Sequence, residues 1–365
     1  MGKKVFLTGI TGLLGAFLAK ELVGKGTVVY ALIRPTKDQS TNDRLESIIK
    51  FVADNNSEYK KLKKNIIPVK GDIIYPRLGI EDDGLLKVIG TEITAVFHSA
   101  AITGFKIPLD QARKVNVYGT KNLLEFIFNI NKNKNLEKFH HISTMYIGGN
   151  GSSHFSENEI LLRGEDQFNN TYELSKYEAE IVVEQFKRSG APISIYRPSI
   201  ITGDSSEGKT NNFRLFYQPL HFFANEVFQK FPGRLDVTLN LINIDVAASV
   251  IIALSELKHC GIFHIINSKS VRVGKFLDIA ASFFRFRKPI FIPKEKFNFD
   301  ELTYVQKQLA SPFVPYLNQF FNFNGQGTFE ILKQRNISVP SFDKNNLLKI
   351  FDYCLKSGFI KKGIK

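Results

Sequence analysis

Two side chains capable of acid–base chemistry, Tyr172 and Lys176, lie four positions apart in the segment NNTYELSKYEAE. On a helix this spacing places both side chains on one face. Reduction of a carbonyl leaves an oxyanion that needs a proton, and a tyrosine can supply it if a neighbouring ammonium lowers the tyrosine pKa. In FHHISTMYIGG, Thr144 could donate a second hydrogen bond to the same oxygen, with Ser143 as the alternative. These residues therefore predict carbonyl chemistry.

Three glycines near the start of the chain, in KKVFLTGITGLLGAFLAKEL, predict the site of a dinucleotide. Gly9 would allow a tight turn after a strand, Gly12 would let the backbone approach a pyrophosphate, and Gly15 would let the following helix pack closely. The N-terminus of that helix offers unpaired N–H groups and a positive dipole end to the phosphates.

The charge at the end of the next strand distinguishes the two nicotinamide dinucleotides. Sites that prefer NAD usually place a carboxylate there for the ribose 2′-hydroxyl, whereas this strand ends at Arg34. A guanidinium suits a 2′-phosphate, and Arg44 could close its other side. Asp72 follows the third strand, where a side chain commonly meets the adenine. The sequence therefore favours NADPH.

The elements that must position these residues alternate between strand-like and helix-like periods through most of the first 200 residues. This alternation predicts an α/β fold, a doubly wound parallel (Rossmann) sheet that binds ligands at the carboxyl ends of its strands. The expected strands are 4–8, 27–33, 65–70, 95–98, 138–142 and 192–196, and the expected helices are 12–23, 43–55, 111–129 and 172–188.

After Pro198 the alternation breaks down, although a strand–helix unit at 238–257 and a strand at 262–266 continue the sheet pattern. The polar stretch 205–212 is typical of a loop, and the segment beyond 289 is rich in Phe. We therefore expect a smaller, interleaved C-terminal substrate domain. The predicted NADP-binding domain comprises 1–203 and 237–285, and the substrate-binding domain comprises 204–236 and 286–365.

Composition excludes several other classes of protein. The 365 residues are 43% hydrophobic, which is typical of a globular chain with a sizeable core. The net charge is +14, but the sequence contains no stretch of basic residues interleaved with aromatic ones, which a nucleic-acid binder would be expected to have. Cys260 and Cys354 form no metal-ligand spacing, and we expect no metal site. No uninterrupted apolar run reaches the roughly 18 residues of a membrane span, so a cytoplasmic protein is expected.

The ordered set of these motifs resembles the extended short-chain dehydrogenase/reductase superfamily over about residues 3–270. VFHSAA at 96–101 is similar to its turn after the fourth strand, and VNVYGTKNLL at 115–124 to its asparagine segment. YRPSIITG at 196–203 and INIDVA at 242–247 are similar to its Arg-Pro and late aspartate segments. The residues expected at the cofactor are Gly9, Thr11, Gly12, Leu13, Leu14, Gly15, Arg34, Arg44, Asp72, Ile73, Ser99, Ala100, Ala101, Asn116, Ser143, Tyr172, Lys176, Pro198, Ser199 and Ile200.

Finer features resemble the branch of thioester reductase domains and fatty acyl-CoA reductases. LIRPTKDQSTNDRLESI carries that branch's two arginines, and 311–332 resembles its tail region. The resemblance implies that NADPH delivers hydride to an acyl thioester, that Thr144 and Tyr172 stabilise the oxyanion, and that Lys176 tunes Tyr172. The product would be an aldehyde or an alcohol. The thioester would arrive on CoA or on a separate, acidic carrier protein, and the chain would be a monomer or a homodimer.

Three other functions stay open at this point. A sugar-nucleotide epimerase or dehydratase of the same superfamily would hold NAD, which Arg34 disfavours. An NADP-dependent reductase or dehydrogenase of a free carbonyl or hydroxyl compound would use the same catalytic residues. A non-catalytic NADPH-binding regulator would not need Thr144, Tyr172 and Lys176 together. Acyl chain length and the end point of reduction cannot be derived from the sequence.

Overall fold

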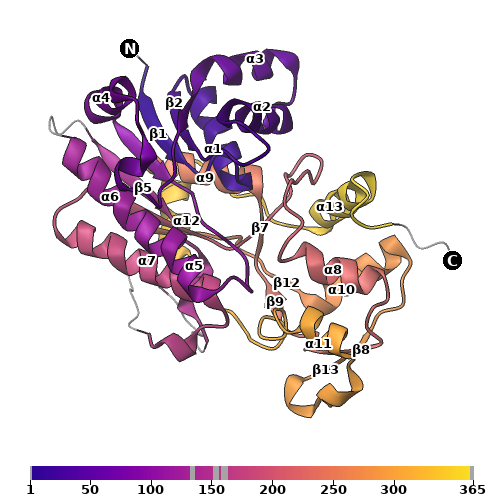
Figure 1. Cartoon of the computed structure of the whole chain (residues 1–365). Coiled ribbons are helices and arrows are strands. Elements are labelled where there is room, and N and C mark those ends of the chain that lie inside the picture. Colours follow the sequence, from indigo (N-terminus) through magenta and orange to yellow (C-terminus); the bar gives the residue numbers. More distant parts are fainter. Residues whose placement is uncertain (1, 132–135, 151–155, 158–162, 362–365) are drawn as a thin grey trace.

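The computed structural model describes residues 2–131, 136–150, 156–157 and 163–361, and its centre is a seven-stranded parallel sheet (Figure 1). The strands are β1 (Lys4–Thr8), β2 (Val28–Ile33), β3 (Ile66–Lys70), β4 (Ala95–His98), β5 (Lys138–Ile142), β6 (Ile193–Pro198) and β11 (Ile262–Ile265). Their order is β11-β6-β5-β4-β1-β2-β3, and each neighbouring pair is parallel. The predicted doubly wound sheet is confirmed. Because the chain winds in opposite directions from β1 and β4, a crevice forms at their carboxyl ends.

Helices cover both faces of the sheet, which separates its apolar side chains into two cores. One core contains Val5 and Leu7 of β1 and is covered by α1 (Leu13–Gly24), α2 (Thr41–Val52), α3 (Asn56–Asn65) and α9 (Ile244–Ser255). The other contains Phe6 and is covered by α4 (Asp83–Thr91), α6 (Gly119–Ile130) and α7 (Thr171–Arg188). Alternate residues of one strand thus face opposite layers, as a strand buried on both sides requires.

Two expected helices differ from the structure. The helix expected over 43–55 is α2, which begins at a capping box between Ser40 and Asp43 and ends at Val52, before the separate helix α3. The helix expected over 111–129 comprises α5 (Leu109–Arg113), a wider π turn over Lys114–Tyr118, and α6. Apolar periodicity continues through a single π turn, so the sequence pattern does not reveal the break.

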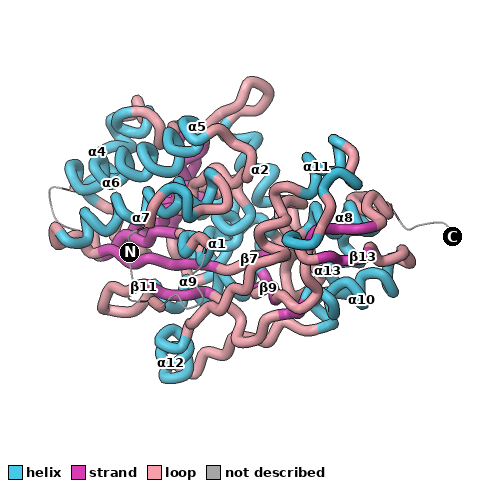
Figure 2. Tube along the Cα trace, turned by 90° about the horizontal axis from the view of Figure 1, so that it is seen from below, coloured by secondary structure: helices cyan, strands magenta, loops and turns pink. Residues whose placement is uncertain are grey.

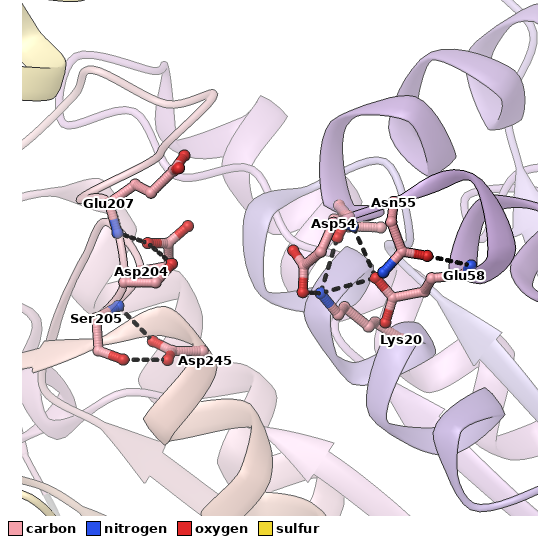
Figure 3. Close-up of polar contacts among 10 residues, drawn as sticks. Lys20, Asp54, Asn55, Glu58, Asp204, Ser205, Glu207 and Asp245 are labelled. Atoms are coloured by element: carbon pink, nitrogen blue, oxygen red, sulfur yellow. Dashed lines mark hydrogen bonds and ion pairs between the residues drawn. The ribbon is translucent and has the colours of Figure 1, made fainter.

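Ionic contacts at the periphery hold the elements of the first core together (Figure 3). Lys20 of α1 pairs with Asp54 at 2.8 Å and with Glu58 of α3 at 3.2 Å. In the late aspartate segment, Asp245 in the first turn of α9 accepts hydrogen bonds from the backbone N–H of Ser205, at 2.9 Å, and from its hydroxyl. Asp245 therefore fixes the loop 203–209 rather than contributing to the site.

Apart from the two cores that flank the sheet, a separate hydrophobic core, called the second core from here on, is formed by elements that lie beyond the carboxyl edge of the sheet (Figures 1 and 2). The core that contains Val5 and Leu7 is called the first core. Its helices are α8 (Tyr217–Ala224), α10 (Val273–Phe284), α11 (Tyr304–Ala310) and α13 (Lys344–Lys356). Short strand pairs accompany it: β7 (Ile200–Thr202) with β10 (Leu241–Asn243), β8 (Lys230–Pro232) with β13 (Ile290–Ile292), and β9 (Thr238–Leu239) with β12 (Val271–Arg272). The domain boundaries stay a prediction. The buried side chains of α10, which falls within the range 237–285 expected for the NADP-binding domain, lie in this second core.

The C-terminal part returns to the sheet before it ends in the second core. Helix α12 (Gln326–Gln334) lies behind the sheet in Figure 1, and its Leu332 is buried in the first core. The backbone N–H of His264, on the free edge of β11, donates to the Thr328 hydroxyl of α12 at 3.1 Å. The edge strand is therefore covered by a segment that follows most of the second core in sequence.

Candidate active site

The turn between β1 and α1 has the geometry that the glycine spacing predicts. Gly9 has a φ of +81°, and a Cβ atom there would lie 2.5 Å from the backbone N of Ala100. A Cβ atom on Gly15 would lie 2.1 Å from the Gly9 carbonyl oxygen. The first turn of α1 can therefore lie this close to the end of β1 only if residue 15 is glycine. Gly12 is the N-cap of α1, and no side chain caps this helix. The first backbone N–H groups of α1 therefore point toward the crevice without a capping side chain.

One cavity of about 320 Å³ connects this turn with the ends of β4, β5 and β6 and with the second core. It brings together residues from five sequence motifs. The expected site residues that line it are Gly12, Leu13, Leu14, Gly15, Ser99, Ala101, Ser143, Thr144, Tyr172, Lys176, Pro198, Ser199 and Ile200. The hydroxyl of Ser199 is buried and has no hydrogen-bond partner in the described parts of the chain. A buried donor of this kind fits a cavity that accepts a polar ligand group.

The two arginines expected to distinguish NADPH from NADH lie close together outside the cavity. Arg44 donates to the Arg34 carbonyl oxygen and, at 3.1 Å, to the hydroxyl of Thr11 in the glycine turn. Partial burial and the positive charge of Arg34 both lower the pKa of Arg44. Arg34 itself pairs with Asp72 at 3.4 Å. Two mutually repelling guanidinium groups beside the glycine turn fit an anionic group such as a 2′-phosphate.

Three of the remaining expected cofactor residues lie outside the cavity lining. Asn116 is buried and braces the loop after β4: its amide donates to the carbonyl of Ile102 at 3.1 Å and to the Ser175 hydroxyl at 2.9 Å. The Ile73 side chain is packed in the core on the second face of the sheet, with the helices that cover it. The backbone of Ala100 packs against Gly9. The predicted contact of these three residues with the cofactor stays a prediction.

The three expected catalytic residues meet at the cavity. Thr144 follows β5 and lines the cavity beside Tyr172, which projects from the first turn of α7. The Thr144 hydroxyl donates to the Pro198 carbonyl at 3.5 Å. Lys176, one turn further along, is 3% exposed and donates to the Ile142 carbonyl at 2.7 Å. Asn170 caps α7 by accepting the N–H of Glu173 at 3.0 Å, which fixes where Tyr172 leaves the helix.

The pKa values differ from the expectation that Lys176 lowers that of Tyr172. Burial raises the pKa of Tyr172 to about 12, although the Thr144 hydroxyl beside it acts in the opposite direction. Burial also lowers the pKa of Lys176 to about 8. The reason is geometric: the ammonium of Lys176 is directed to the Ile142 carbonyl, so its charge contributes less to Tyr172 than burial does. Tyr172 is therefore a phenol, and a proton donor, at neutral pH.

Ser143 is committed to a buried ionic network, which separates its role from that of Thr144. Its hydroxyl donates to Glu180 at 2.5 Å, and Glu180 forms a fully buried ion pair with Arg197, the arginine of the Arg-Pro segment. The Thr144 hydroxyl donates only at 3.5 Å, to the neutral Pro198 carbonyl, so it is more easily redirected to a substrate oxygen than that of Ser143. The predicted contact of Ser143 with the cofactor stays a prediction.

The far end of the cavity is apolar and penetrates the second core. The lining side chains there include Phe216, Phe223, Leu239, Val273, Phe276, Leu277, Phe313 and Leu317. The aromatic segment 215–231 therefore serves two purposes: Phe216 and Phe223 line the cavity, whereas Phe228 and Phe231 are buried core residues outside its lining.

Several residues of the site were not anticipated from the sequence. Phe105, Tyr146 and Tyr316 form an aromatic wall beside Tyr172, and Glu173 is fully buried next to it. Tyr316 lies 143 positions from Glu173, with which it forms a hydrogen bond, so no local pattern joins them. The sequence offers one hint, because Glu173 is a charged residue within the buried face of the helix that carries YELSK.

His98, at the end of β4, is buried with a hydroxyl within hydrogen-bond distance of each ring nitrogen. His98 has its ring nitrogens 2.7 Å from the Thr8 hydroxyl and 2.8 Å from the Thr120 hydroxyl. Burial lowers its pKa to about 3, so the ring is neutral. Across the described ranges there is no group of three His, Cys, Asp or Glu side chains that could hold a metal. In the same ranges, every helix is too short or too polar to cross a bilayer.

Comparison with known proteins gives concordant results. The family model described as "Male sterility protein" matches residues 7–251. A linear gramicidin synthase polypeptide of Brevibacillus parabrevis is 26% identical over 97% of this chain, which spans 7% of the synthase polypeptide. Fatty acyl-CoA reductase 1 of Gallus gallus is 31% identical over 58% of this chain and 46% of the reductase. The chain thus spans less than half of either relative.

Solved structures extend the likeness over nearly the whole chain. The terminal R domain from the myxalamid PKS-NRPS biosynthetic pathway has a TM-score of 0.83 and 25% identity, covering 99% of this chain and 92% of that domain. A UDP-glucuronic acid 4-epimerase from Bacillus cereus, in complex with NAD, has a TM-score of 0.68 at 20% identity, a likeness of fold alone.

Proposed function

Since the chain belongs to the NAD-binding family described as male sterility protein, we propose that it is an NADPH-dependent reductase of acyl thioesters. One observation supports the proposal: Thr144 and Tyr172 line a single cavity whose lining includes both the glycine turn and the apolar side chains of the second core. A carbonyl placed there would lie between a dinucleotide site and a pocket for an acyl chain. The similar proteins include fatty acyl-CoA reductases, which agrees with this substrate class.

The cofactor side of the cavity supports the choice of NADPH. The N–H groups at the start of α1 would hold the pyrophosphate, and Arg34 and Arg44 would hold the 2′-phosphate. Ser199 and the Pro198 backbone would lie along the nicotinamide. When bound, a reduced nicotinamide supplies the two electrons of the reaction as hydride.

Thr144 and Tyr172 would provide the electrophilic half of the site. As the thioester carbon is reduced, negative charge grows on its oxygen, and two hydroxyl donors at that position stabilise it. Tyr172, which is protonated at neutral pH, would transfer its proton to that oxygen. Collapse of the resulting hemithioacetal breaks the carbon–sulfur bond and releases an aldehyde and a free thiol.

Lys176 would orient the bound cofactor and stabilise the charge that forms on Tyr172. Its ammonium uses one N–H for the Ile142 carbonyl, so two N–H donors are available for a ribose hydroxyl. A pKa of about 8 keeps most of the side chain charged at neutral pH. This charge favours the phenolate that Tyr172 becomes after it gives up its proton.

The test is consumption of NADPH by the purified protein with acyl-CoA thioesters of varied chain length. NADH, a free aldehyde and a UDP-sugar serve as parallel arms. We expect NADPH loss with aldehyde or alcohol formation from a thioester, and Tyr172→Phe should lower turnover by about 10²-fold or more while NADPH affinity stays nearly unchanged. Turnover of the free aldehyde without any thioester would replace the proposal by a free-carbonyl reductase, and full activity of Tyr172→Phe would remove the catalytic assignment.

A further inference from the structure

Glu173, the neighbour of Tyr172 in the first turn of α7, is a fully buried carboxylate. The side chain is 0% exposed, and no Lys or Arg of the described residues forms an ion pair with it. Its hydrogen-bond donors are the backbone N–H of Asn169 at 2.9 Å, the Asn169 side chain at 3.4 Å, and the Tyr316 hydroxyl. Burial of a carboxylate is costly, so this set of donors indicates a specific structural purpose.

Tyr316 comes from the segment between α11 and α12, far from α7 in sequence. Its hydroxyl accepts a hydrogen bond from the Asn170 amide at 2.6 Å and donates to Glu173. Burial and the charge of Glu173 hold the Tyr316 pKa well above 10, so the hydroxyl stays protonated and continues to donate. The first turn of the catalytic helix thus fixes one tyrosine of the C-terminal part through two hydrogen bonds.

The ring of Tyr316 organises the aromatic wall of the cavity. It stacks on Phe105 with ring centroids 5.3 Å apart and meets Tyr146 edge to face at 5.4 Å. Phe105 follows β4, and Tyr146 follows β5 just after Thr144, so the three rings come from three separate segments. All three line the cavity together with Tyr172. The aromatic wall of the cavity therefore includes a ring that Glu173 and Asn170 hold in place.

We propose that Glu173 is a positioning residue that holds the Tyr316 ring as the wall of the acyl site beside Tyr172, so that affinity for the acyl group depends on this pair. The inference rests on the proposed function for its substrate, but the contact itself does not. Loss of the Tyr316 hydroxyl would free the ring and the segment 311–317 without removing a group that touches the reacting atoms. Acyl binding would weaken, whereas cofactor binding, on the other side of Tyr172, would not.

The test compares Tyr316→Phe and Glu173→Gln with Tyr304→Phe, a matched control whose side chain is 77% exposed on α11. Steady-state rates with an acyl-CoA should show a KM about tenfold higher for Tyr316→Phe, with kcat and NADPH affinity within about twofold. Glu173→Gln keeps one oxygen that can accept from Tyr316 and should raise KM by only about threefold. Tyr304→Phe should match the unmodified protein.

Hydrogen–deuterium exchange of the same proteins separates this inference from the proposed function. Faster exchange in 311–317 for Tyr316→Phe, with unchanged exchange in residues 4–24, is the expected result. Unchanged exchange in 311–317, an unchanged KM, or a fall in kcat at constant KM would overturn the positioning role. If the unmodified protein turns over no thioester while exchange at 311–317 still responds, the proposed substrate is wrong and the contact stands.

Discussion

Substitution of the buried Lys176 by Met should stabilise the fold near pH 7 while it disables the enzyme. Burial lowers the pKa of Lys176 from 10.5 to about 8, which at ~1.36 kcal/mol per pKa unit corresponds to about 3 kcal/mol of unfavourable free energy in the folded state. Met has a similar length and no charge. Loss of the hydrogen bond to Ile142 would offset about 1 kcal/mol of the gain, so a net stabilisation of about 2 kcal/mol is expected.

The pH dependence of this gain has a defined sign. Below the folded-state pKa of about 8, Lys176 is charged in both the folded and the unfolded chain, so the full penalty is present. Above that value the folded chain loses its proton while the unfolded chain keeps it up to about pH 10.5, and the penalty shrinks. The advantage of Met should therefore decline by about 2 kcal/mol between about pH 8 and pH 9.5.

Urea unfolding monitored by circular dichroism at several pH values measures the effect. Lys121→Met is the control, since that side chain is 54% exposed on α6 and should change stability by less than about 0.5 kcal/mol at every pH. Turnover by Lys176→Met should fall by about 10²-fold or more. A Lys176→Met protein that is less stable near pH 7, or whose stability difference is constant with pH, would refute the argument that burial penalises this ammonium.

Three further outcomes are expected. Gly15→Ala should abolish NADPH binding and cost more than about 2 kcal/mol in urea unfolding, because its Cβ would lie 2.1 Å from a backbone oxygen, whereas Gly24→Ala, with no atom within 4 Å, should be neutral or slightly stabilising. Arg34→Ala should raise the KM for NADPH at least about tenfold and change the KM for NADH little, and equal effects on both would exclude a 2′-phosphate contact. Burial raises the pKa of Glu173 from 4.5 to about 7. Ionisation of Glu173 therefore lowers the free energy of unfolding progressively as pH rises through that range. The stability of Glu173→Gln relative to the unmodified protein should therefore grow by up to about 3 kcal/mol from about pH 5 to pH 8, and a constant difference would contradict the shift.

The sheet and the glycine turn could be predicted because their determinants are local. A strand, three glycines and a helix are adjacent in sequence, and the parallel sheet then brings the ends of β1, β4, β5 and β6 to one edge. The meeting of Thr144 with Tyr172 follows from that topology, since the first follows β5 and the second begins the helix after it. The catalytic roles of both are still predictions.

What the sequence did not reveal depends on partners far apart in the chain. Ser143 and Thr144 are equivalent as hydroxyls in the sequence. Only the structure shows that Ser143 donates to the buried Glu180 carboxylate at 2.5 Å, whereas Thr144 donates to the Pro198 carbonyl at 3.5 Å. The expected effect of Lys176 on Tyr172 missed the Ile142 carbonyl that draws the ammonium away. The Tyr316 contact could not be anticipated either, because side-chain burial is decided by packing between the two cores and not by spacing along one helix.

The return of α12 to the free edge of β11 has a consequence for synthesis of the chain. On the ribosome, all seven strands of the sheet emerge before residue 266. Helix α12 follows some sixty residues later, and its Thr328 accepts from the His264 N–H together with the earlier Glu157 carboxylate. Until then α12 does not cover the edge of β11, and another chain could approach it. Completion of the first core must therefore wait for Leu332 of α12, and a nascent chain stalled between β11 and α12 would expose this edge to aggregation.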